Sequence, residues 1–214
     1  MGVAFVSEKY IAFVFDDGPR APMNEMVDKF VQYGGKASFA IVGKRITDDT
    51  ESMLRYAIDN GCQLASHSQS HVRLDRMEDT EAMKTEMLQP IEEVRRRLGY
   101  TMTMARLPGH CFNDMVLAAM TELRLPLLGV DNDCARDWEP GSMPESIAEA
   151  VLRTVRDGSI VTLHVTRNTC DALDTILPAL QRQGYRFVTG EELFAAKGIT
   201  DIPLGINIRN VNLL

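Results

Sequence analysis

Residues 15–19 read Phe-Asp-Asp-Gly-Pro, and this stretch decides the fold because two adjacent carboxylates follow an apolar run over residues 10–15. The run predicts a buried strand, and the Gly-Pro pair predicts a turn directly after the acids. Asp16 and Asp17 are therefore expected at the C-terminal end of the strand, where α/β folds bind their ligands. A turn on the surface is the alternative fate of such a pair.

Apolar runs and amphipathic stretches alternate along the chain. Short apolar runs predict strands, and apolar residues spaced three or four positions apart predict helices. Repeated units of this kind imply an α/β fold of parallel strands with right-handed crossovers, as an open doubly wound sheet or a closed barrel. Strands are expected at 10–15, 37–42, 63–65, 104–106, 127–130, 159–165 and 185–188, and helices at 24–33, 48–58, 80–98 with a kink at Pro90, 113–123, 144–155, 170–183 and 191–196.

No linker rich in Pro, Gly or Ser interrupts this alternation, so residues 1–214 are expected to form a single domain with its core at about 10–195. The tail, residues 199–214, places apolar side chains at every second position. This period predicts a strand with one apolar face that packs on the body or on a partner. The alternating residues are Ile202, Leu204, Ile206 and Ile208.

The composition indicates a soluble globular protein, with 45% hydrophobic and 25% charged residues. A net charge of -7 without a stripe of Lys or Arg excludes nucleic acid as a partner. No stretch approaches the roughly 18 apolar residues of a transmembrane segment, and no basic region followed by an apolar segment begins the chain. The cysteines lack a C-x-x-C spacing, which excludes a zinc knuckle and leaves disulfides open: Cys62, Cys111, Cys134 and Cys170.

Polar groups that could do chemistry recur where predicted strands end. Besides the two acids, His67 and His71 follow one strand and His164 ends another. Two histidines separated by three residues converge on one point if the backbone turns helically, and a carboxylate from another strand end completes a three-ligand site with an open position for water. That is the geometry of a catalytic metal site. Two solvated histidines are the alternative for the pair.

These residues resemble the five ordered motifs of the NodB-type polysaccharide deacetylases, carbohydrate esterase family four. The resemblance covers about residues 10–195 and implies a distorted (β/α) barrel of about seven parallel strands. The motifs that carry it are Asp16-Asp17-Gly18-Pro19, His67-Ser-x-x-His71, Arg106-x-Pro108, Asp137-Trp138 and the late strand with His164.

The resemblance implies metal-assisted removal of an N-acetyl or O-acetyl group from a sugar. Asp17, His67 and His71 match the family's metal ligands, with Zn²⁺ as the expected ion and Co²⁺ or another transition metal as alternatives. Asp16 matches the general base. A divalent metal polarises the amide carbonyl and acidifies a water, while a neighbouring carboxylate takes the proton of that water.

Further roles follow from the same resemblance. His164 matches the general acid that protonates the departing amine, and Asp137 matches the carboxylate that orients it. Arg106 resembles the cation that keeps the base ionised. The backbone N–H of Gly109 matches an oxyanion donor, and Trp138 matches a wall of the acetyl pocket.

The chain departs from the usual motifs at two positions near the substrate. His110 follows Pro108 and Gly109 where glycine or a similar residue is more usual, and it could line the substrate groove or cap the loop. Thr162 replaces the aliphatic residue that usually helps to line the acetyl pocket, while Leu163 should face the other side of its strand.

The leading hypothesis is a metal-dependent deacetylase of N-acetylglucosamine units in peptidoglycan or a chitin-type glycan. O-deacetylation of acetylxylan is the alternative reaction on the same site. A catalytically silent glycan-binding relative and an iron oxygenase with two histidine ligands and one carboxylate are the alternatives from other classes. The chain itself leaves its location open, because a protein trimmed of its export signal would look the same. The resemblance suggests a secreted or cell-envelope protein that acts on an acetylated glycan, and it leaves the oligomeric state open.

Overall fold

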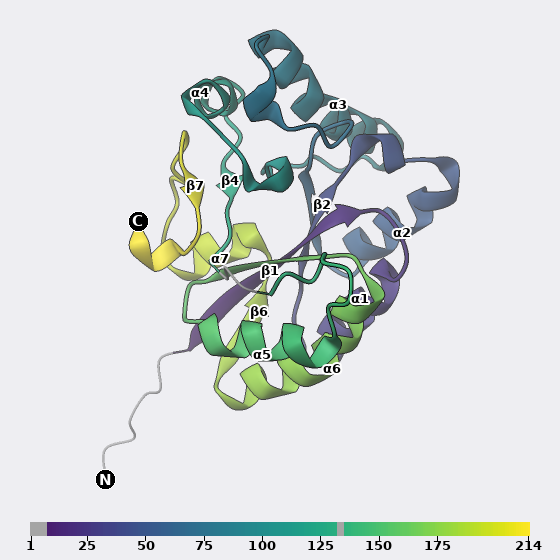
Figure 1. Ribbon diagram of the computed structural model, residues 1–214, viewed down its shortest axis with the longest axis vertical. Helices are drawn as coiled ribbons and strands as arrows, with labels where there is room; N and C mark the ends of the chain where they lie inside the picture. Colours follow the sequence, from purple (N-terminus) through teal and green to yellow (C-terminus); the bar gives the residue numbers. More distant parts are fainter. Residues whose placement is uncertain (1–7, 132–134) are drawn as a thin grey trace.

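The computed structural model describes residues 8–131 and 135–214, and as far as α7 its strands and helices alternate as predicted except between α3 and α4, where no strand forms (Figure 1). Cys134 lies outside the described residues. The strands are β1 (Lys9–Gly18), β2 (Ser38–Ile41), β3 (Gln63–Ser66), β4 (Leu127–Leu128), β5 (Ile160–His164), β6 (Tyr185–Val188) and β7 (Asn207–Ile208). The helices are α1 (Met23–Gln32), α2 (Asp48–Asp59), α3 (Thr80–Leu98), α4 (Asp114–Glu122), α5 (Pro144–Thr154), α6 (Arg167–Arg182) and α7 (Gly190–Ala196).

β1 is the central strand of the molecule. It pairs in parallel with β2, β5 and β6, and β3 continues the sheet beyond β2. The apolar run from Ile11 to Phe15 is completely buried. A parallel strand is covered on both faces, which explains why this segment is continuously apolar and not alternating. The α/β class predicted from the sequence is confirmed.

Isolated bridges carry the sheet beyond β3. Ser66 at the end of β3 bridges Ala105, which in turn bridges Leu127 of β4. β7 pairs in parallel with β4, and Asn210 just after it bridges Ser159 just before β5. These pairings lead from β1 through β2, β3, β4 and β7 to β5, which pairs with β1 again. The described residues thus form a ring of the kind that the distorted barrel requires.

Two predicted strands differ from the structure. The extended segment expected at 104–106 contributes only the bridge at Ala105. In the tail only β7 forms, and the predicted apolar face is wrong: Ile208 is buried, but Ile206 is 41% exposed. The physical reason is a bend before β7, where Gly205 has a φ of 71° and interrupts the extended backbone on which the alternation depends.

Capping residues mark the ends of α3 and the start of α6. Asp79 accepts hydrogen bonds from the first turn of α3, and Gly99 ends that helix with a φ of 68°. α3 continues through Pro90, so the proline does not end it. α6 begins at Arg167, three residues before the predicted start, because the Thr166 hydroxyl accepts from the amide of Thr169 and caps the helix there.

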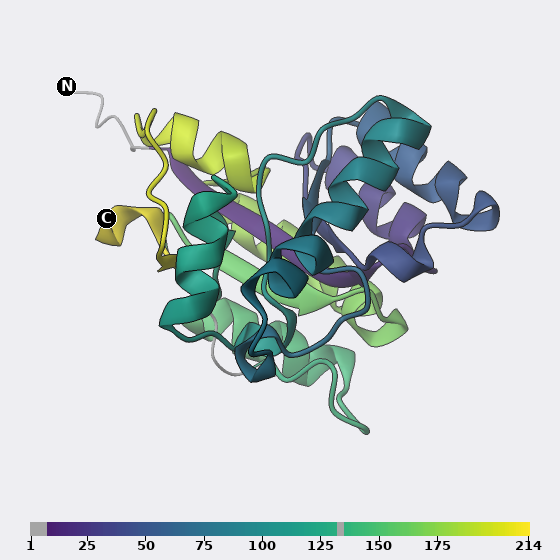
Figure 2. The same ribbon diagram turned by 90° about the horizontal axis from the view of Figure 1, so that it is seen from above.

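The helices surround the strands in contacting pairs. α5 packs on α6, α1 contacts both α6 and α2, and α4 lies against α3 (Figures 1 and 2). In both views the C-terminal segment lies beside β4 and α4, away from α1 and α2. None of the helices in the described ranges is both long and apolar enough to cross a bilayer. The thiols of Cys62, Cys111 and Cys170 are free.

The largest core cluster is organised around aromatic rings from β1, α1 and β6. The ring of Phe30 on α1 packs edge-on against Phe13, Phe15 and Phe187, with centroid distances of 5.5, 5.7 and 5.8 Å. All of these side chains are buried, so this cluster joins the first helix to strands from both ends of the chain.

We expect Phe30→Ala to lower the free energy of unfolding by about 3 to 5 kcal/mol, because it removes a fully buried ring and leaves a cavity between three others. Urea denaturation followed by circular dichroism measures the change. Val31→Ala on the same helix is the control, because Val31 is 46% exposed and its truncation should have an effect below about 0.5 kcal/mol. A similar small loss in both variants would contradict the proposed role of the aromatic cluster.

Candidate active site

The end of β1 places both neighbouring acids in one cavity. Consecutive side chains of a regular strand point to opposite faces. The pairing of β1 with β2 shifts register between Phe15 and Gly18, and Asp17 lies in the left-handed region with a φ of 74°. This irregularity turns the strand at the two acids, and Asp16 and Asp17 both line the same cavity.

The loop after β3 supplies the two histidines. His67 is buried, and its Nδ1 lies 2.7 Å from the carbonyl oxygen of Arg106. Because a carbonyl can only accept, Nδ1 carries the proton and Nε2 keeps its lone pair. Burial lowers the pKa of His67, which favours the neutral ring. Its Nε2 is therefore a competent metal ligand.

His71 is brought back toward His67 by a tight turn. Ser68 and His71 have φ values of 61° and 62°, and the amide of His71 donates to the Ser68 hydroxyl over 2.9 Å. The two imidazole rings lie 4.9 Å apart between centroids. Glu86 on α3 holds the loop from outside, since its carboxylate accepts from both the amide and the hydroxyl of Ser70.

Asp17, His67 and His71 fit a metal ion. Their ligand atoms all lie within 4.8 Å of one another, and His71 Nε2 is 3.4 Å from Asp17 Oδ1. Within the described residues, Asp17 Oδ1 and His67 Nε2 are buried and form no hydrogen bond. A buried acceptor without a donor is costly, and a cation at this point would satisfy both atoms. Two imidazoles and one carboxylate are a common donor set of catalytic zinc sites.

Asp16 lies beside this group in a different environment. Its Oδ2 is 3.3 Å from Nε of the buried Arg106 and 3.9 Å from Nε2 of His67. Burial alone would raise the pKa of Asp16, but the surrounding charges, above all that of Arg106, outweigh it and hold the pKa below its usual value. The carboxylate is thus ionised and next to the ligand group.

His164 faces Asp16 from the neighbouring strand. The two residues are register partners on β5 and β1. Asp137 holds the histidine at two points, because Oδ1 lies 2.9 Å from Nδ1 of the ring and Oδ2 accepts from the His164 amide over 2.6 Å. Burial favours the neutral ring, but the hydrogen bond to Asp137 and the charge of Asp16 raise the pKa of His164 above its usual value.

Thr169 completes this arrangement, and the sequence did not single it out. Its hydroxyl donates to Asp137 Oδ2 over 2.7 Å, and the residue is fully buried in the first turn of α6. Arg45 was also missed. Its guanidinium contacts the Asp17 carbonyl oxygen and lies 3.7 Å from Asp17 Oδ1. Neither residue stands in a recognisable motif, so only the folded chain identifies them.

Most of the residues predicted on the substrate side line one cavity, which has a volume of about 630 Å³. Gly109, His110, Trp138 and Thr162 line it, whereas Pro108 is buried and does not. Trp138 is 63% exposed at the edge, so it is not a core aromatic. The strand alternation holds on β5, where Leu163 packs in the core. The remaining lining residues are Asp16, Asp17, His71, Arg106, Val130, Ala135, Arg136, Asp137 and His164.

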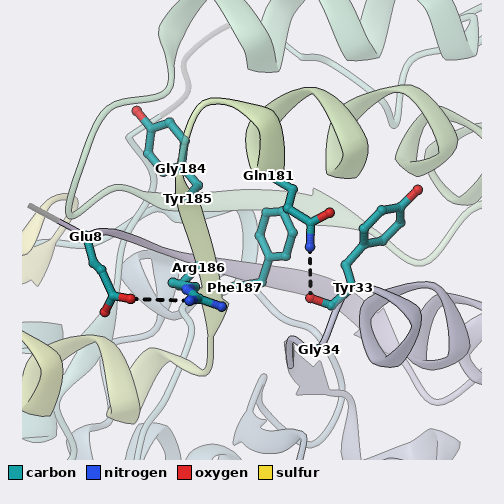
Figure 3. A pocket seen from close by; sticks show the side chains of 8 residues that line it. All are labelled: Glu8, Tyr33, Gly34, Gln181, Gly184, Tyr185, Arg186 and Phe187. Carbon is teal, nitrogen blue, oxygen red and sulfur yellow. Dashed lines mark hydrogen bonds and ion pairs between the residues drawn. The ribbon is translucent and has the colours of Figure 1, made fainter. Parts of the chain in front are cut away.

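A second hollow, of about 360 Å³, lies at the opposite end of β1 (Figure 3). Its wall includes an ion pair of Glu8 with Arg186 at 3.3 Å and a hydrogen bond from the Gln181 amide to the Tyr33 carbonyl. None of the predicted site residues lines it. The candidate site is therefore the cavity at the C-terminal ends of the strands.

Comparison with known proteins agrees with this geometry. The family model described as polysaccharide deacetylase matches residues 5–128, which is more than half of the chain. The peptidoglycan-N-acetylglucosamine deacetylase of Bacillus cereus is 31% identical over 198 residues, which cover 89% of this chain and 91% of the relative. The peptidoglycan-N-acetylmuramic acid deacetylase PdaC of Bacillus subtilis is 31% identical over 194 residues, which cover 89% of this chain and 40% of the relative.

Among solved structures, the family 4 acetyl xylan esterase of Clostridium thermocellum in complex with a cobalt ion superposes with a TM-score of 0.87. It is 31% identical, and the match covers 95% of this chain and 99% of the esterase. The chain spans only 32% to 40% of the length of several curated relatives that it matches. The resemblance predicted from the ordered motifs is confirmed, and the chain belongs to the polysaccharide deacetylase family.

Proposed function

We propose that the protein is a metal-dependent hydrolase that removes N-acetyl groups from N-acetylglucosamine units of a peptidoglycan or chitin-type polysaccharide. One observation carries this proposal. An ionised carboxylate, Asp16, and a histidine with a raised pKa, His164, are register partners that flank one cavity beside a three-ligand group. Hydrolysis of an amide needs such a base and acid on opposite sides of the reacting carbonyl.

Asp17, His67 and His71 would hold the divalent ion. When bound, the ion supplies a Lewis acid that polarises the acetyl carbonyl and makes water easier to deprotonate. Zn²⁺ suits two imidazole nitrogens and a carboxylate oxygen, and the cobalt ion in the solved esterase supports a site that accepts more than one transition metal. Glu86 accepts a hydrogen bond from the loop that carries His71, and Arg45 lies beside Asp17, so both residues help to hold the ligands in place.

Asp16 takes the proton of the attacking water in this proposal. Asp16 lines the cavity, and its Oδ1 is buried and accepts no hydrogen bond from the described residues, so this oxygen keeps its lone pairs for a proton. Arg106 keeps the carboxylate ionised. His164 then gives its proton to the departing amine, and Asp137 orients the ring through Nδ1 so that Nε2 is left for the substrate.

The acetyl group would occupy the part of the cavity between these residues. We propose that the Gly109 amide supplies a donor to the developing oxyanion and that Trp138 and Thr162 bound the pocket. The Thr162 hydroxyl donates to the carbonyl of Gly129, which leaves its methyl group to line the pocket as an aliphatic side chain would. A wall polymer as substrate implies that the protein works outside the cytoplasm.

O-deacetylation of acetylxylan is the second candidate, and the similarity to the solved acetyl xylan esterase favours it. Incubation of Zn²⁺-loaded protein with chitooligosaccharides, peptidoglycan and acetylxylan, with acetate as the readout, separates the candidates. We expect acetate from the N-acetylated glycans and none after chelation. Release from acetylxylan alone would establish the second candidate. Sugar binding without acetate from any glycan would indicate a silent relative, and dependence on O₂ an oxygenase.

Substitutions of the two acids should impair the enzyme in different ways. We expect Asp17→Ala to weaken Zn²⁺ binding by at least about tenfold, because a ligand is lost. We expect Asp16→Asn to keep its Zn²⁺ affinity and lose about 10² to 10⁴-fold in kcat, the usual effect of losing a general base. Isothermal titration calorimetry and acetate release measure the two effects. Equal metal affinities in both variants would contradict the division of roles.

The pH profile should report on His164. As general acid it must be protonated, so activity falls as pH rises through its pKa. Asp137 raises that pKa, and Asp137→Asn should therefore move the alkaline limb of kcat/KM to lower pH by about one unit. Asp201→Asn, an exposed change in the tail, serves as the control. An alkaline limb that stays in place in Asp137→Asn would remove His164 from the role of acid.

A further inference from the structure

The C-terminal segment is built into the wall of the barrel next to the site. The amide of Gly129, directly after β4, donates to the carbonyl of Ile208 over 2.6 Å, and the amide of Ile160 on β5 donates to the carbonyl of Arg209 over 3.0 Å. The segment therefore fills the space between β4 and β5. Residue 129 must be glycine, because a Cβ there would lie 2.4 Å from the Ile208 carbonyl oxygen.

This placement brings the side chain of Asn207 to His110. The Nδ2 atom of Asn207 lies 3.1 Å from Nδ1 of His110, and Nη1 of Arg106 lies 2.9 Å from the same nitrogen. A guanidinium can only donate, so Nδ1 of His110 must be an acceptor. The ring is thus neutral with its proton on Nε2, and Asn207 presents its NH₂ group to it.

His110 is the nearest partner of the Arg106 guanidinium among the contacts of the described residues. The contacts of Arg106 with Asp16 and with the Leu128 carbonyl are longer, at 3.3 and 3.4 Å. Arg106 is only 4% exposed, so the loss of an acceptor from its guanidinium is costly. The position of its guanidinium therefore depends on the imidazole of His110, and the orientation of that imidazole depends on Asn207.

We propose that Asn207 and His110 are positioning residues that place Arg106 against Asp16, so that the C-terminal segment completes the active site. The effect on catalysis rests on the proposed deacetylase function, whereas the arrangement of the side chains does not. It gives a role to His110 at the position where the family motif usually has glycine. It also gives a role to the tail, whose contribution to the site the sequence did not indicate.

The kinetic experiment uses Asn207→Ala, with Asn212→Ala as the matched control. Asn212 lies in the same segment, but it is exposed and bonds to Asp157 away from the site. We expect Asn207→Ala to lower kcat about tenfold with KM and Zn²⁺ affinity unchanged, because a misplaced Arg106 affects the base and not the ligands. We expect wild-type kinetics from Asn212→Ala. Unchanged kcat in Asn207→Ala, or an equal loss in both variants, would overturn the proposal.

A conservative replacement separates positioning from mere packing. His110 has a φ of 55°, a conformation that asparagine tolerates better than most residues, and an asparagine side-chain oxygen can accept from Arg106. We expect His110→Asn to retain most of the kcat that His110→Ala loses. Equal losses in the two variants would contradict the requirement for an acceptor.

Nitrogen-15 NMR of the imidazoles tests the arrangement without reference to turnover. We expect His110 in the wild-type protein to be neutral with its proton on Nε2, and to lose this single tautomer in Asn207→Ala. A proton on Nδ1 in the wild type would overturn the proposal even in an active enzyme. If the wild type released no acetate but showed the expected tautomer, the deacetylase function would fail and the positioning arrangement would stand.

Discussion

The site depends on an interruption of β1 at the point where two carboxylates meet. Asp16 and Asp17 would point to opposite faces in a regular strand, one toward the cavity and one toward the helices. The register shift against β2 and the left-handed backbone of Asp17 bring both to the same cavity. Such a conformation is unfavourable for a residue with a side chain, and it persists only where the surrounding structure enforces it. Here β2 and β5 pair with β1 next to the two acids and supply that constraint.

The same constraint separates the chemistry of the two acids. Asp16 keeps the regular pairing with β5, which puts it opposite His164 and within reach of Arg106. Asp17 is turned toward the loop that carries His71. Asp16 is therefore paired with the buried Arg106, whereas Asp17 lies with His71 in the three-ligand group. That difference in surroundings supports the proposal that Asp16 acts as the base and Asp17 as a metal ligand.

Much of this could be predicted from the sequence, because several of the candidate site residues come at the end of an apolar run. Asp16, His67 and His164 follow or close buried strands, and parallel strands bring their C-terminal ends to one edge. The interruption in β1 could not be predicted, since it is defined by pairing with a strand more than twenty residues away. The strand predicted for the tail differs from the structure for a similar reason. The alternation of Ile206 and Ile208 fits a strand, but the backbone bends at Gly205, so only Ile208 is buried.

Residues that support the reacting groups are harder to find than the reacting groups themselves. Thr169 looks like any helix-start threonine, yet its hydroxyl donates to the carboxylate that holds His164. Asn207 stands in a tail without a recognisable motif, yet it contacts His110, the acceptor of a buried arginine. Their roles come from the burial of the charged groups they touch. A charge removed from water must have every hydrogen-bonding position satisfied, and the last partners come from whichever segment the fold brings near. Here those segments are the first turn of α6, which carries Thr169, and β7, which carries Asn207. The elements that complete the barrel therefore also supply the last hydrogen-bonding partners of the site.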